Sequence, residues 1–197
     1  GTHYVVGWAG VDPATGAPLF LDQNGNVTRE FSDDFLVADY GSWLPTVTGG
    51  FGLDYSYRNF SVRAQFNYSY GNNIFNNQLY FQENPNFGQY NQRKVMLTMW
   101  QEPGDLTEIQ SNAFPRQFTS KDIEDASYLR LRNILVSYTI PGNLFRNQIK
   151  GVRIFVQAQN LLTFTKFTGF DPEDYNNIAQ YAYPLPRIFT SGVDINF

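Results

Sequence analysis

The residues that could act as acids, bases or metal ligands are few and scattered along the chain. The sequence has no cysteine and a single histidine, His3, close to its first residue. A catalytic triad or a histidine-based metal centre would have to be assembled around that one ring. We therefore expect His3 to be an incidental loop residue, and we predict neither an enzyme nor a metal or cofactor site.

Two acidic clusters could in principle pair a general acid with a general base. One contains Glu124 and Asp125, and the other contains Asp171, Glu173 and Asp174. Both lie in stretches that are expected to be loops, and their spacing defines no catalytic pair. Solvated loop charge, or hydrogen bonding between loops, is the expected role of these carboxylates.

Residues 22–26 (DQNGN) resemble a calcium-binding loop only superficially. The glycine stands at the fourth position, whereas an EF-hand loop needs glycine at the sixth position and glutamate at the twelfth. Short apolar stretches at 18–21 and 27–28 flank this segment. The Asn-Gly pair is therefore predicted to form the turn of a β-hairpin.

The elements that must position any site are indicated by a period-two alternation of apolar and polar residues. Alternate side chains of a strand point to opposite faces, and a membrane strand needs about 9–11 residues. The last alternating segment runs to Phe197, although terminal residues of soluble domains usually fray. The pattern predicts an all-β, transmembrane antiparallel β-barrel. Its strands are expected at about 50–58, 60–70, 128–140, 151–165 and 187–197.

The third predicted strand is less regular than the others. Ile134, Val136 and Tyr138 share one parity, but Arg130 and Arg132 share it too. Both arginines lie toward one end of the strand. We expect this end to project above the bilayer, so that the arginines sit at headgroup height and the parity survives.

The connections predict the orientation and show that the wall is incomplete. Short links near 58–59 and 141–150 are expected on the periplasmic side, and external loops at about 1–48, 71–127 and 166–186. Five strands cannot close a barrel, and an open edge in lipid leaves unpaired backbone groups. The chain is therefore expected to be part of a larger barrel, completed by another chain or by a preceding segment.

Composition excludes some partners and suggests others. The formal net charge is −4, which argues against nucleic-acid binding, and aromatic residues make up 17% of the chain. Tyrosines on the apolar parity of the first two strands are expected to form interfacial girdles. These are Tyr55, Tyr57, Tyr68 and Tyr70. Aromatic residues of the external loops are possible ligand contacts: Trp43, Tyr80 and Trp100.

Six segments together resemble the C-terminal part of the SusC/RagA-type TonB-dependent outer-membrane transporters. They appear in the family's order and span nearly the whole chain, although Trp43 departs from the usual pattern. The segments are AGVDPATGAPLFLDQNGN (9–26), GSWLPTVTGGF (41–51), WQEPGD (100–105), IEDASYLRLRNILVSYTIP (123–141), VRIFVQAQNLLTFTKFTGFDPE (152–173) and YPLPRIFTSGVDINF (183–197).

The resemblance implies a barrel of about 22 strands with a plug, of which this chain would supply the last five strands. Such transporters import oligosaccharides, peptides or similar nutrients across the bacterial outer membrane. The implied partners are the remaining barrel and plug, the TonB system acting through a region outside this sequence, and a SusD-like surface lipoprotein. This chain would supply wall, external loops and an assembly signal.

Site residues can then be assigned by position. The terminal assembly signal would comprise Val193, Ile195 and Phe197. The polar residues expected to line the lumen, in contact with plug or solute, are Asp54, Arg63, Gln65, Asn67, Arg153, Gln157 and Gln159.

Two rival interpretations remain open at this point. One is a passive outer-membrane barrel or adhesin without energy coupling. The other is a secreted all-β carbohydrate-binding sandwich, since short alternating strands and many aromatic residues also suit that fold. The sandwich requires the apolar residues to be buried between two sheets: Phe51, Phe66, Ile154, Val156 and Ile195.

Overall fold

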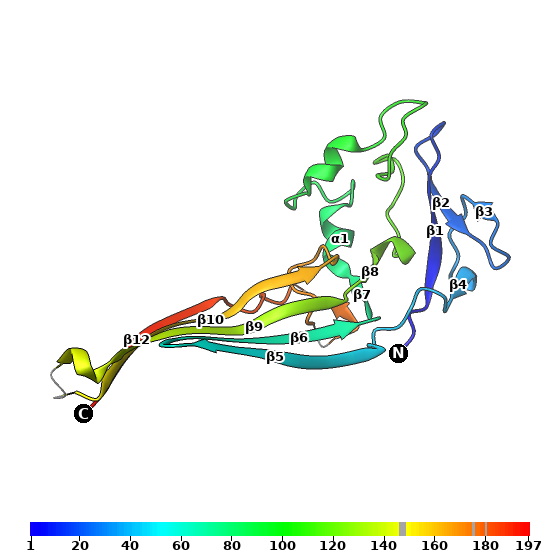
Figure 1. The fold of residues 1–197 in the computed structure, drawn as a ribbon. Helices are drawn as coiled ribbons and strands as arrows, with labels where there is room; N and C mark the ends of the chain where they lie inside the picture. The colour runs from blue at the N-terminus through cyan, green and yellow to red at the C-terminus, as the bar shows by residue number, and fades with distance from the viewer. Residues whose placement is uncertain (146–148, 175, 180) are drawn as a thin grey trace. The chain divides into compact units, whose positions relative to one another are not determined.

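A computed structural model describes residues 1–145, 149–174, 176–179 and 181–197 (Figure 1). The chain divides into two compact units. The first comprises Gly1–Pro45, Gly71–Ala126 and Phe167–Ala182, and the second comprises Thr46–Tyr70, Ser127–Lys166 and Tyr183–Phe197. In the described part of the chain, no helix is both long enough and apolar enough to cross a membrane.

The second unit is one antiparallel sheet of five strands. Its order is β12-β10-β9-β6-β5, so neighbours in space are mostly neighbours in sequence (Figure 1). The strands occupy the five segments whose alternation predicts them. Their bounds are β5 (Val47–Tyr57), β6 (Phe60–Tyr70), β9 (Tyr128–Pro141), β10 (Gly151–Thr165) and β12 (Ile188–Asn196), and a short 3₁₀ helix, η4 (Gly142–Phe145), follows β9.

The first two strands of this sheet form the tightest hairpin of the unit. Tyr57 pairs with Phe60, which leaves Arg58 and Asn59 as a two-residue turn. Arg58 has a φ of 53°, a left-handed conformation that two-residue hairpins require and that residues with a Cβ rarely adopt. The Asn59 carbonyl accepts a 2.8 Å hydrogen bond from the Thr139 amide, which ties the turn to β9.

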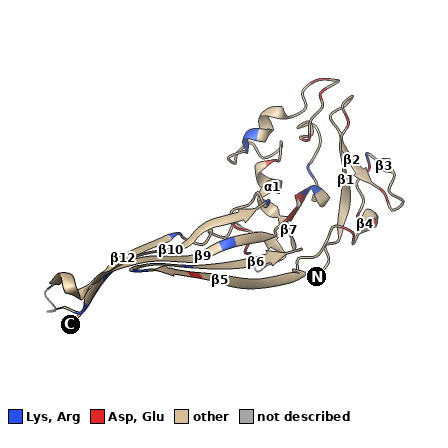
Figure 2. Ribbon diagram, viewed as in Figure 1, with Lys and Arg blue, Asp and Glu red and all other residues tan. Residues whose placement is uncertain are grey.

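The register gathers the apolar residues on one face of the sheet. Val62 lies opposite Val136, and Val136 lies opposite Val156. The Phe51 and Phe66 rings stack with centroids 4.9 Å apart, which shows that they share this face. Figure 2 shows the strands almost wholly free of charge, with isolated Lys, Arg, Asp and Glu positions. We call this surface the apolar face and its opposite the polar face.

A β-bulge interrupts the alternation of β9. Gln65 of β6 lies opposite Asn133, but the next residue, Phe66, lies opposite Leu131. Arg132 is therefore the extra residue of β9. Beyond an extra residue, the side chains of the bulged strand alternate between the two faces of the sheet in the opposite order to that expected from the residues before it.

The bulge corrects the expected position of the two arginines. Beyond Arg132 the apolar face continues through Leu131 and Leu129, because both lie opposite apolar-face residues of β6. Arg130 instead lies on the polar face, opposite Asn67, and only 2% of its surface is exposed. The prediction that both arginines keep the apolar parity at headgroup height is therefore wrong.

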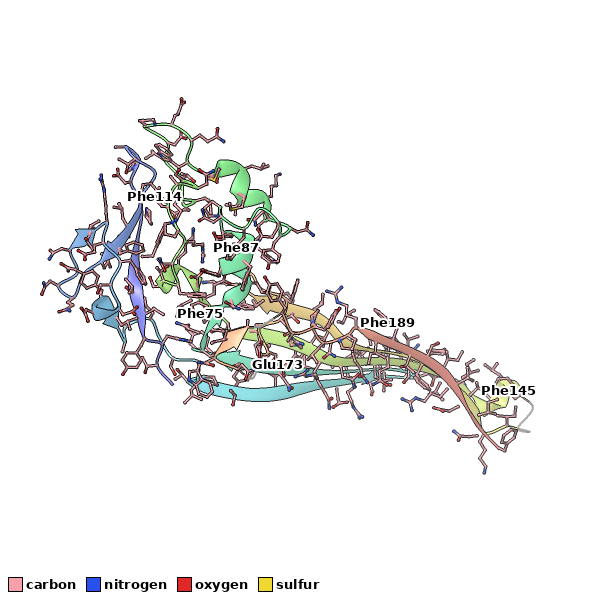
Figure 3. All side chains as sticks on the ribbon, turned by 180° about the vertical axis from the view of Figure 1, so that it is seen from behind. Phe75, Phe87, Phe114, Phe145, Glu173 and Phe189 are labelled. Atoms are coloured by element: carbon pink, nitrogen blue, oxygen red, sulfur yellow. The ribbon has the colours of Figure 1, made fainter. Side chains whose placement is uncertain are left out.

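The apolar face is not covered by a second sheet. Phe51, Ile154, Val156 and Ile195 are each between 45% and 53% exposed. Figure 3 shows side chains projecting from both faces of the strands, with Phe189 labelled on β12. The carbohydrate-binding sandwich, which requires these side chains to be buried between two sheets, is therefore excluded.

The first unit carries more regular structure than external loops were expected to have. One sheet has the order β3-β2-β1-β4 and another has the order β11-β7-β8. The strands are β1 (Val5–Val11), β2 (Pro18–Leu21), β3 (Val27–Thr28), β4 (Leu36–Val37), β7 (Asn73–Asn76), β8 (Ile123–Asp125) and β11 (Ile178–Ala179). The helices are α1 (Asn77–Gln82), η1 (Asp33–Phe35), η2 (Lys94–Thr98) and η3 (Ser120–Asp122).

The predicted hairpin at residues 22–26 is present in this unit. Leu21 pairs with Val27, so the hairpin loop spans five residues, with Gly25 at a φ of 79°. The Asp22 carboxylate accepts hydrogen bonds from the Asn24 and Asn26 amides, both at 2.8 Å. These hydrogen bonds lower the pKa of Asp22, and the bond from the Asn26 amide has the largest effect. The Asp22 carboxylate therefore stabilises the turn of this hairpin.

The core of the first unit is small and rich in polar groups. Ile74, Ala126, Phe167 and Ala179 form its cluster of buried apolar residues. Around this cluster the unit buries many polar side chains, which must then be hydrogen-bonded to avoid a desolvation penalty. The buried polar residues include His3, Asn76, Gln78, Glu83, Asn84, Gln110, Arg116, Thr119 and Asp122.

A buried ion pair lies within the segment Gly71–Ala126 of this unit. Arg116 Nη2 lies 2.5 Å from Asp122 Oδ1, and their side chains are 5% and 0% exposed. Asp122 also accepts from the Thr119 amide at 3.2 Å, which completes a capping box at the start of η3. The carboxylate therefore has both a counter-ion and a backbone donor, as a buried charge requires.

Candidate binding cavity and barrel wall

The register places every residue predicted to line a lumen on the polar face. Asp54 lies opposite Arg63, while Gln65 and Gln159 lie opposite Asn133 from its two sides. The remaining predicted residues fall on the same face by the same pairing: Asn67, Arg153 and Gln157. Reasoning from the sequence thus grouped residues that the sheet brings together.

Polar-face residues form cross-strand pairs. Arg63 Nε contacts Asp54 Oδ1 at 2.5 Å, and Gln157 Nε2 donates to Asn133 Oδ1 at 3.0 Å. The hydroxyls of Ser61 and Ser137 lie 2.8 Å apart. Such pairs satisfy polar side chains locally and stabilise the sheet by a few tenths of a kcal/mol to about 1 kcal/mol each.

The bulge concentrates further polar groups beside these pairs. Arg132 Nη1 donates to Asn160 Oδ1 at 3.2 Å, and Asn160 Nδ2 donates to the Pro186 carbonyl at 3.1 Å. Asn160 has a φ of 52°, which asparagine tolerates better than most residues. Alternation along a single strand does not reveal this arrangement, because it arises where β9 and β10 leave regular register.

The predicted assembly residues lie together at the end of β12. Val193 and Ile195 lie opposite Ile154 and Val152, so they belong to the apolar face. Phe197 follows the strand and is 79% exposed. The structure thus presents an exposed apolar strand end.

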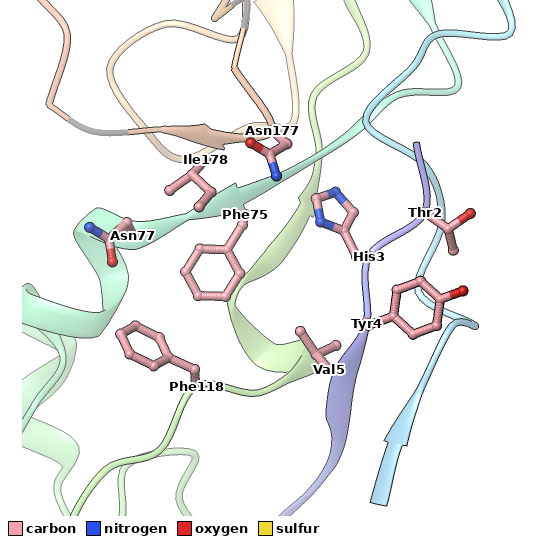
Figure 4. A pocket seen from close by; sticks show the side chains of 9 residues that line it. All are labelled: Thr2, His3, Tyr4, Val5, Phe75, Asn77, Phe118, Asn177 and Ile178. Carbon is pink, nitrogen blue, oxygen red and sulfur yellow. The ribbon is translucent and has the colours of Figure 1, made fainter. Parts of the chain in front are cut away.

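The first unit contains a cavity of about 430 Å³. Figure 4 shows side chains reaching it from the beginning of β1, from β7 and α1, and from β11. Its lining residues come from four regions that are distant in sequence. They are Thr2, His3, Tyr4, Val5, Phe75, Asn77, Phe118, Asn177 and Ile178.

His3 is a structural residue of this cavity wall, which corrects the expectation that it is incidental. It is 7% exposed, and its Nε2 lies 2.8 Å from the Asn73 carbonyl oxygen. Its own amide donates to the Gly41 carbonyl at 3.2 Å. The ring therefore fastens the first residues of the chain to β7.

An aromatic cluster adjoins the cavity through Phe75 and Phe118. The Tyr80 ring stacks on Phe118 with centroids 3.9 Å apart, and Phe118 lies 5.5 Å from Phe75. The Arg116 guanidinium lies 5.4 Å from the centre of the Tyr80 ring. Tyr80 therefore already contacts two side chains of the protein itself, Phe118 and Arg116.

The other two predicted ligand contacts lie away from this cavity. The indole nitrogen of Trp100 donates to the Pro13 carbonyl at 3.0 Å. A Cβ on Gly16 would lie 2.5 Å from the Trp100 ring, so the indole packs directly on that glycine. Trp43 is partly exposed, and its amide is bonded to the Gly1 carbonyl at 2.8 Å. The three aromatic residues are not brought together.

The acidic clusters form no catalytic pair among the described residues. Glu124 accepts from the amide and hydroxyl of Thr168, each at 2.7 Å, which is the expected hydrogen bonding between loops. The Asp171 and Asp174 carboxylates accept from the amides of Glu173 and Asn176. The described part of the chain contains no group of three or more His, Cys, Asp or Glu residues that could hold a metal ion.

Sequence reasoning did not identify the cavity. Phe75, Asn77, Phe118 and Asn177 stand in stretches without periodicity, and no motif marks them. The only available signal was the single histidine, whose burial depends on contacts with residues about 70 positions away.

The chain was compared with known proteins. No protein-family model matches it. It is 32% identical over 200 residues to TonB-dependent receptor P3 of Formosa agariphila, across 94% of this chain and 19% of that protein. TonB-dependent receptor P26 of the same organism is 27% identical over 206 residues, across 94% of this chain and 20% of that protein.

Solved structures agree with these relatives. The chain superposes over its whole length on the RagAB peptide transporter, with a TM-score of 0.90, 35% identity and 23% of that chain covered. The match to the RagAB peptide importer in its open-open state has a TM-score of 0.89, 35% identity and 22% coverage. The chain therefore spans about a fifth of the length of the proteins that it matches. Its five-stranded antiparallel sheet is a segment of an outer-membrane β-barrel, and the chain belongs to the SusC/RagA-type TonB-dependent receptors.

Proposed function

We propose that the protein containing this chain imports nutrient molecules across the outer membrane, driven by the TonB system. The observation that carries the proposal is the exposed apolar face of a five-stranded antiparallel sheet, in a chain similar over its full length to the RagAB peptide transporter. The matched proteins are receptors and importers, and the chain is not an enzyme.

The apolar face contacts lipid and the polar face contacts the lumen or the plug. Alternation of lipid-facing and lumen-facing residues is the rule in outer-membrane barrels. The cross-strand pair of Arg63 and Asp54 and the bond between Gln157 and Asn133 support a wet or protein-filled interior. In this assignment the seven predicted polar residues line that interior.

The topology supports an external role for the first unit. The paired strand ends Val47 and Tyr70 lie at the same end of the sheet as the Tyr128 and Thr165 ends of β9 and β10. All three segments of the first unit join the sheet at this end. The opposite end carries the Arg58-Asn59 turn, and short turns on the periplasmic side with long external loops are typical of such barrels.

The partners follow from this assignment. The two outer strands, β5 and β12, pair with the remaining barrel, which also encloses the plug. TonB acts through a region outside this sequence. A SusD-like surface lipoprotein meets the external loops, and an oligosaccharide or peptide is the solute. For the similar RagAB transporter, the solute is a peptide.

The terminal strand provides the assembly signal. Val193, Ile195 and Phe197 present apolar side chains at the end of β12, where the barrel wall must be sealed. They serve as lipid-facing wall in the finished barrel as well.

Uptake assays test the proposal. Cells lacking the gene should lose uptake of a fluorescent oligosaccharide or peptide nutrient, and cells lacking TonB should lose it to the same extent. Uptake that persists without TonB would instead identify a passive barrel, and surface attachment without any uptake would identify an adhesin.

A further inference from the structure

Both polar and apolar side chains line the 430 Å³ cavity of the first unit, and none of the described lining residues carries a fixed charge. Its volume falls within the range of about 300–1,000 Å³ that is usual for small-molecule sites. Among the residues that the structure describes, the lining contains no Asp, Glu, Lys or Arg. A ligand bound there would therefore have no counter-ion for a charged group, and burying an unpaired charge is strongly unfavourable.

His3 presents a hydrogen-bond acceptor to this cavity. Its Nε2 lies 2.8 Å from the Asn73 carbonyl, and a carbonyl oxygen can only accept. Nε2 therefore carries the hydrogen in the neutral ring, which leaves Nδ1 as an acceptor. In Figure 4 the edge of the ring opposite that bond faces the space beside Phe75.

Two asparagine amides complete the polar lining. Asn77 stands at the first position of α1, and Asn177 immediately precedes β11. Each amide offers one acceptor and two donor hydrogens. Within the described residues, neither side chain forms a hydrogen bond with the protein, so both remain able to bind a ligand.

Phenyl rings supply the apolar part of the lining. Phe75 and Phe118 are tilted by 54° with their centroids 5.5 Å apart, and Figure 4 shows both rings directed into the same space. The Tyr80 ring stacks on Phe118. Rigid rings offer large apolar contact area at little entropic cost, while the few polar groups fix the ligand's orientation.

We propose that this cavity binds a neutral sugar ring, which names the solute class of the proposed importer and rests on that function. A pyranose has an apolar C–H face that matches the phenyl rings. Its hydroxyls both donate and accept, and so match His3, Asn77 and Asn177. A short free peptide brings a charged amine and a charged carboxylate, for which this lining has no counter-ion.

The test measures binding to the full transporter in detergent by isothermal titration calorimetry. The probes are neutral disaccharides of glucose, galactose, mannose and N-acetylglucosamine, with digalacturonic acid, trialanine and N-acetyl-trialanine amide for comparison. At least one neutral disaccharide should bind with a dissociation constant at or below about 1 mM. Digalacturonic acid and trialanine should bind at least about tenfold more weakly, because their charges are not compensated.

Substitutions locate that binding. The double variant Asn77→Ala, Asn177→Ala should weaken disaccharide binding by about tenfold or more, since two hydrogen bonds of roughly 1 kcal/mol each are lost. The matched control is Leu97→Ala, an exposed residue of η2 outside the cavity, which should leave the affinity unchanged. Both variants should keep the heat-modifiable mobility of the folded barrel.

Three outcomes would overturn the assignment. They are no binding by any neutral disaccharide at about 10 mM, an affinity unchanged in the double asparagine variant, or tighter and variant-sensitive binding of N-acetyl-trialanine amide. TonB-dependent uptake measured in the same strains separates the two proposals. Uptake that persists while all disaccharides fail to bind would retain the importer and reject the sugar site.

Discussion

The two units of the molecule follow opposite rules for what is exposed and what is buried. In the five-stranded sheet, Phe189, Val156 and Ile195 are exposed on the apolar face. In the first unit, the apolar residues Val6 and Ile74 are instead almost fully buried. A bilayer wall must present apolar side chains and hide its polar groups inside, whereas an aqueous unit does the reverse.

The comparison also separates two sources of stability. Backbone pairing along long strands holds the sheet, where most residues of β9 have partners on both sides. The first unit has short strands and a small apolar cluster, so it depends on individual polar contacts. Single substitutions should therefore destabilise the first unit when they remove a hydrogen bond or an ion pair. In the sheet, their effect on stability should depend on whether the side chain faces lipid or the interior of the barrel.

The largest effect is expected from breaking the buried ion pair. Asp122→Ala leaves Arg116 buried without its counter-ion, which should cost about 3–5 kcal/mol of local stability. Hydrogen exchange of the amides of Thr119 and of Val6, which forms a β-bridge with Thr119, would measure this loss in the full protein. The double variant Arg116→Met, Asp122→Leu should recover most of the loss. A single variant with unchanged protection would mean that the pair contributes nothing to this unit.

The next effect tests the apolar face. Val136→Arg should destabilise the full-length barrel by about 2–4 kcal/mol, if this face meets the bilayer near its midplane. Gln65→Arg, on the exposed polar face, is the matched control and should fold normally. Folding into lipid vesicles, followed by heat-modifiable gel mobility, measures both. Equal yields would contradict the assignment of the two faces.

A smaller effect tests the packing of Trp100. Gly16 has a φ of 71°, and a Cβ there would lie 2.5 Å from the indole ring. Gly16→Ala should cost more than the roughly 1–2 kcal/mol of a left-handed alanine. Gly25→Ala shares the left-handed backbone, with a φ of 79°, but meets no atom within 4 Å. Hydrogen exchange of both variants would isolate the contact, and equal losses would show that Trp100 does not pack there.

The smallest effect is acid-induced and confined to loops of the first unit. Hydrogen bonds from backbone amides lower the pKa values of Asp12, Asp22 and Asp105 below 3.8. The largest contribution comes from the amide of Ala14 for Asp12, from that of Asn26 for Asp22 and from that of Gln101 for Asp105. Folding is therefore stabilised by these carboxylates above pH 3.8. That stabilisation should disappear as the pH falls through their lowered folded-state pKa values.

Hydrogen exchange near these turns would follow the loss, which should be modest because the carboxylates are exposed to solvent. Asp22→Asn should flatten the acid response of its own turn and leave the other two unchanged. A pH response that is the same in the variant and the parent would show that Asp22 is not its source.

Much of the sheet was predictable because its information is local. The alternation in β6 and β10 depends only on which way successive side chains point. The same rule correctly grouped Asp54, Arg63 and Gln157 on one face. The rule failed at Arg130, because a bulge depends on how two strands pair and cannot be recognised from the residue pattern of either strand alone.

The cavity could not be predicted, because it is formed by residues from distant segments. His3 and Phe75 are brought together by the bond from the imidazole to Asn73, and Asn177 arrives from a third segment through the pairing of β11 with β7. None of these side chains belongs to a repeating pattern. Trp100 and Tyr80 were plausible ligand contacts by residue type, but packing against Gly16 and Phe118 engages them within the protein.

The sequence by itself determined the strands and their two faces, since side-chain direction in a strand follows from backbone geometry alone. Only the tertiary structure decided where the register shifts at Arg132, which polar groups of the first unit are buried, and which side chains meet at the cavity. These features depend on pairings between residues tens of positions apart, and their energy exists only once the chain has brought both partners together.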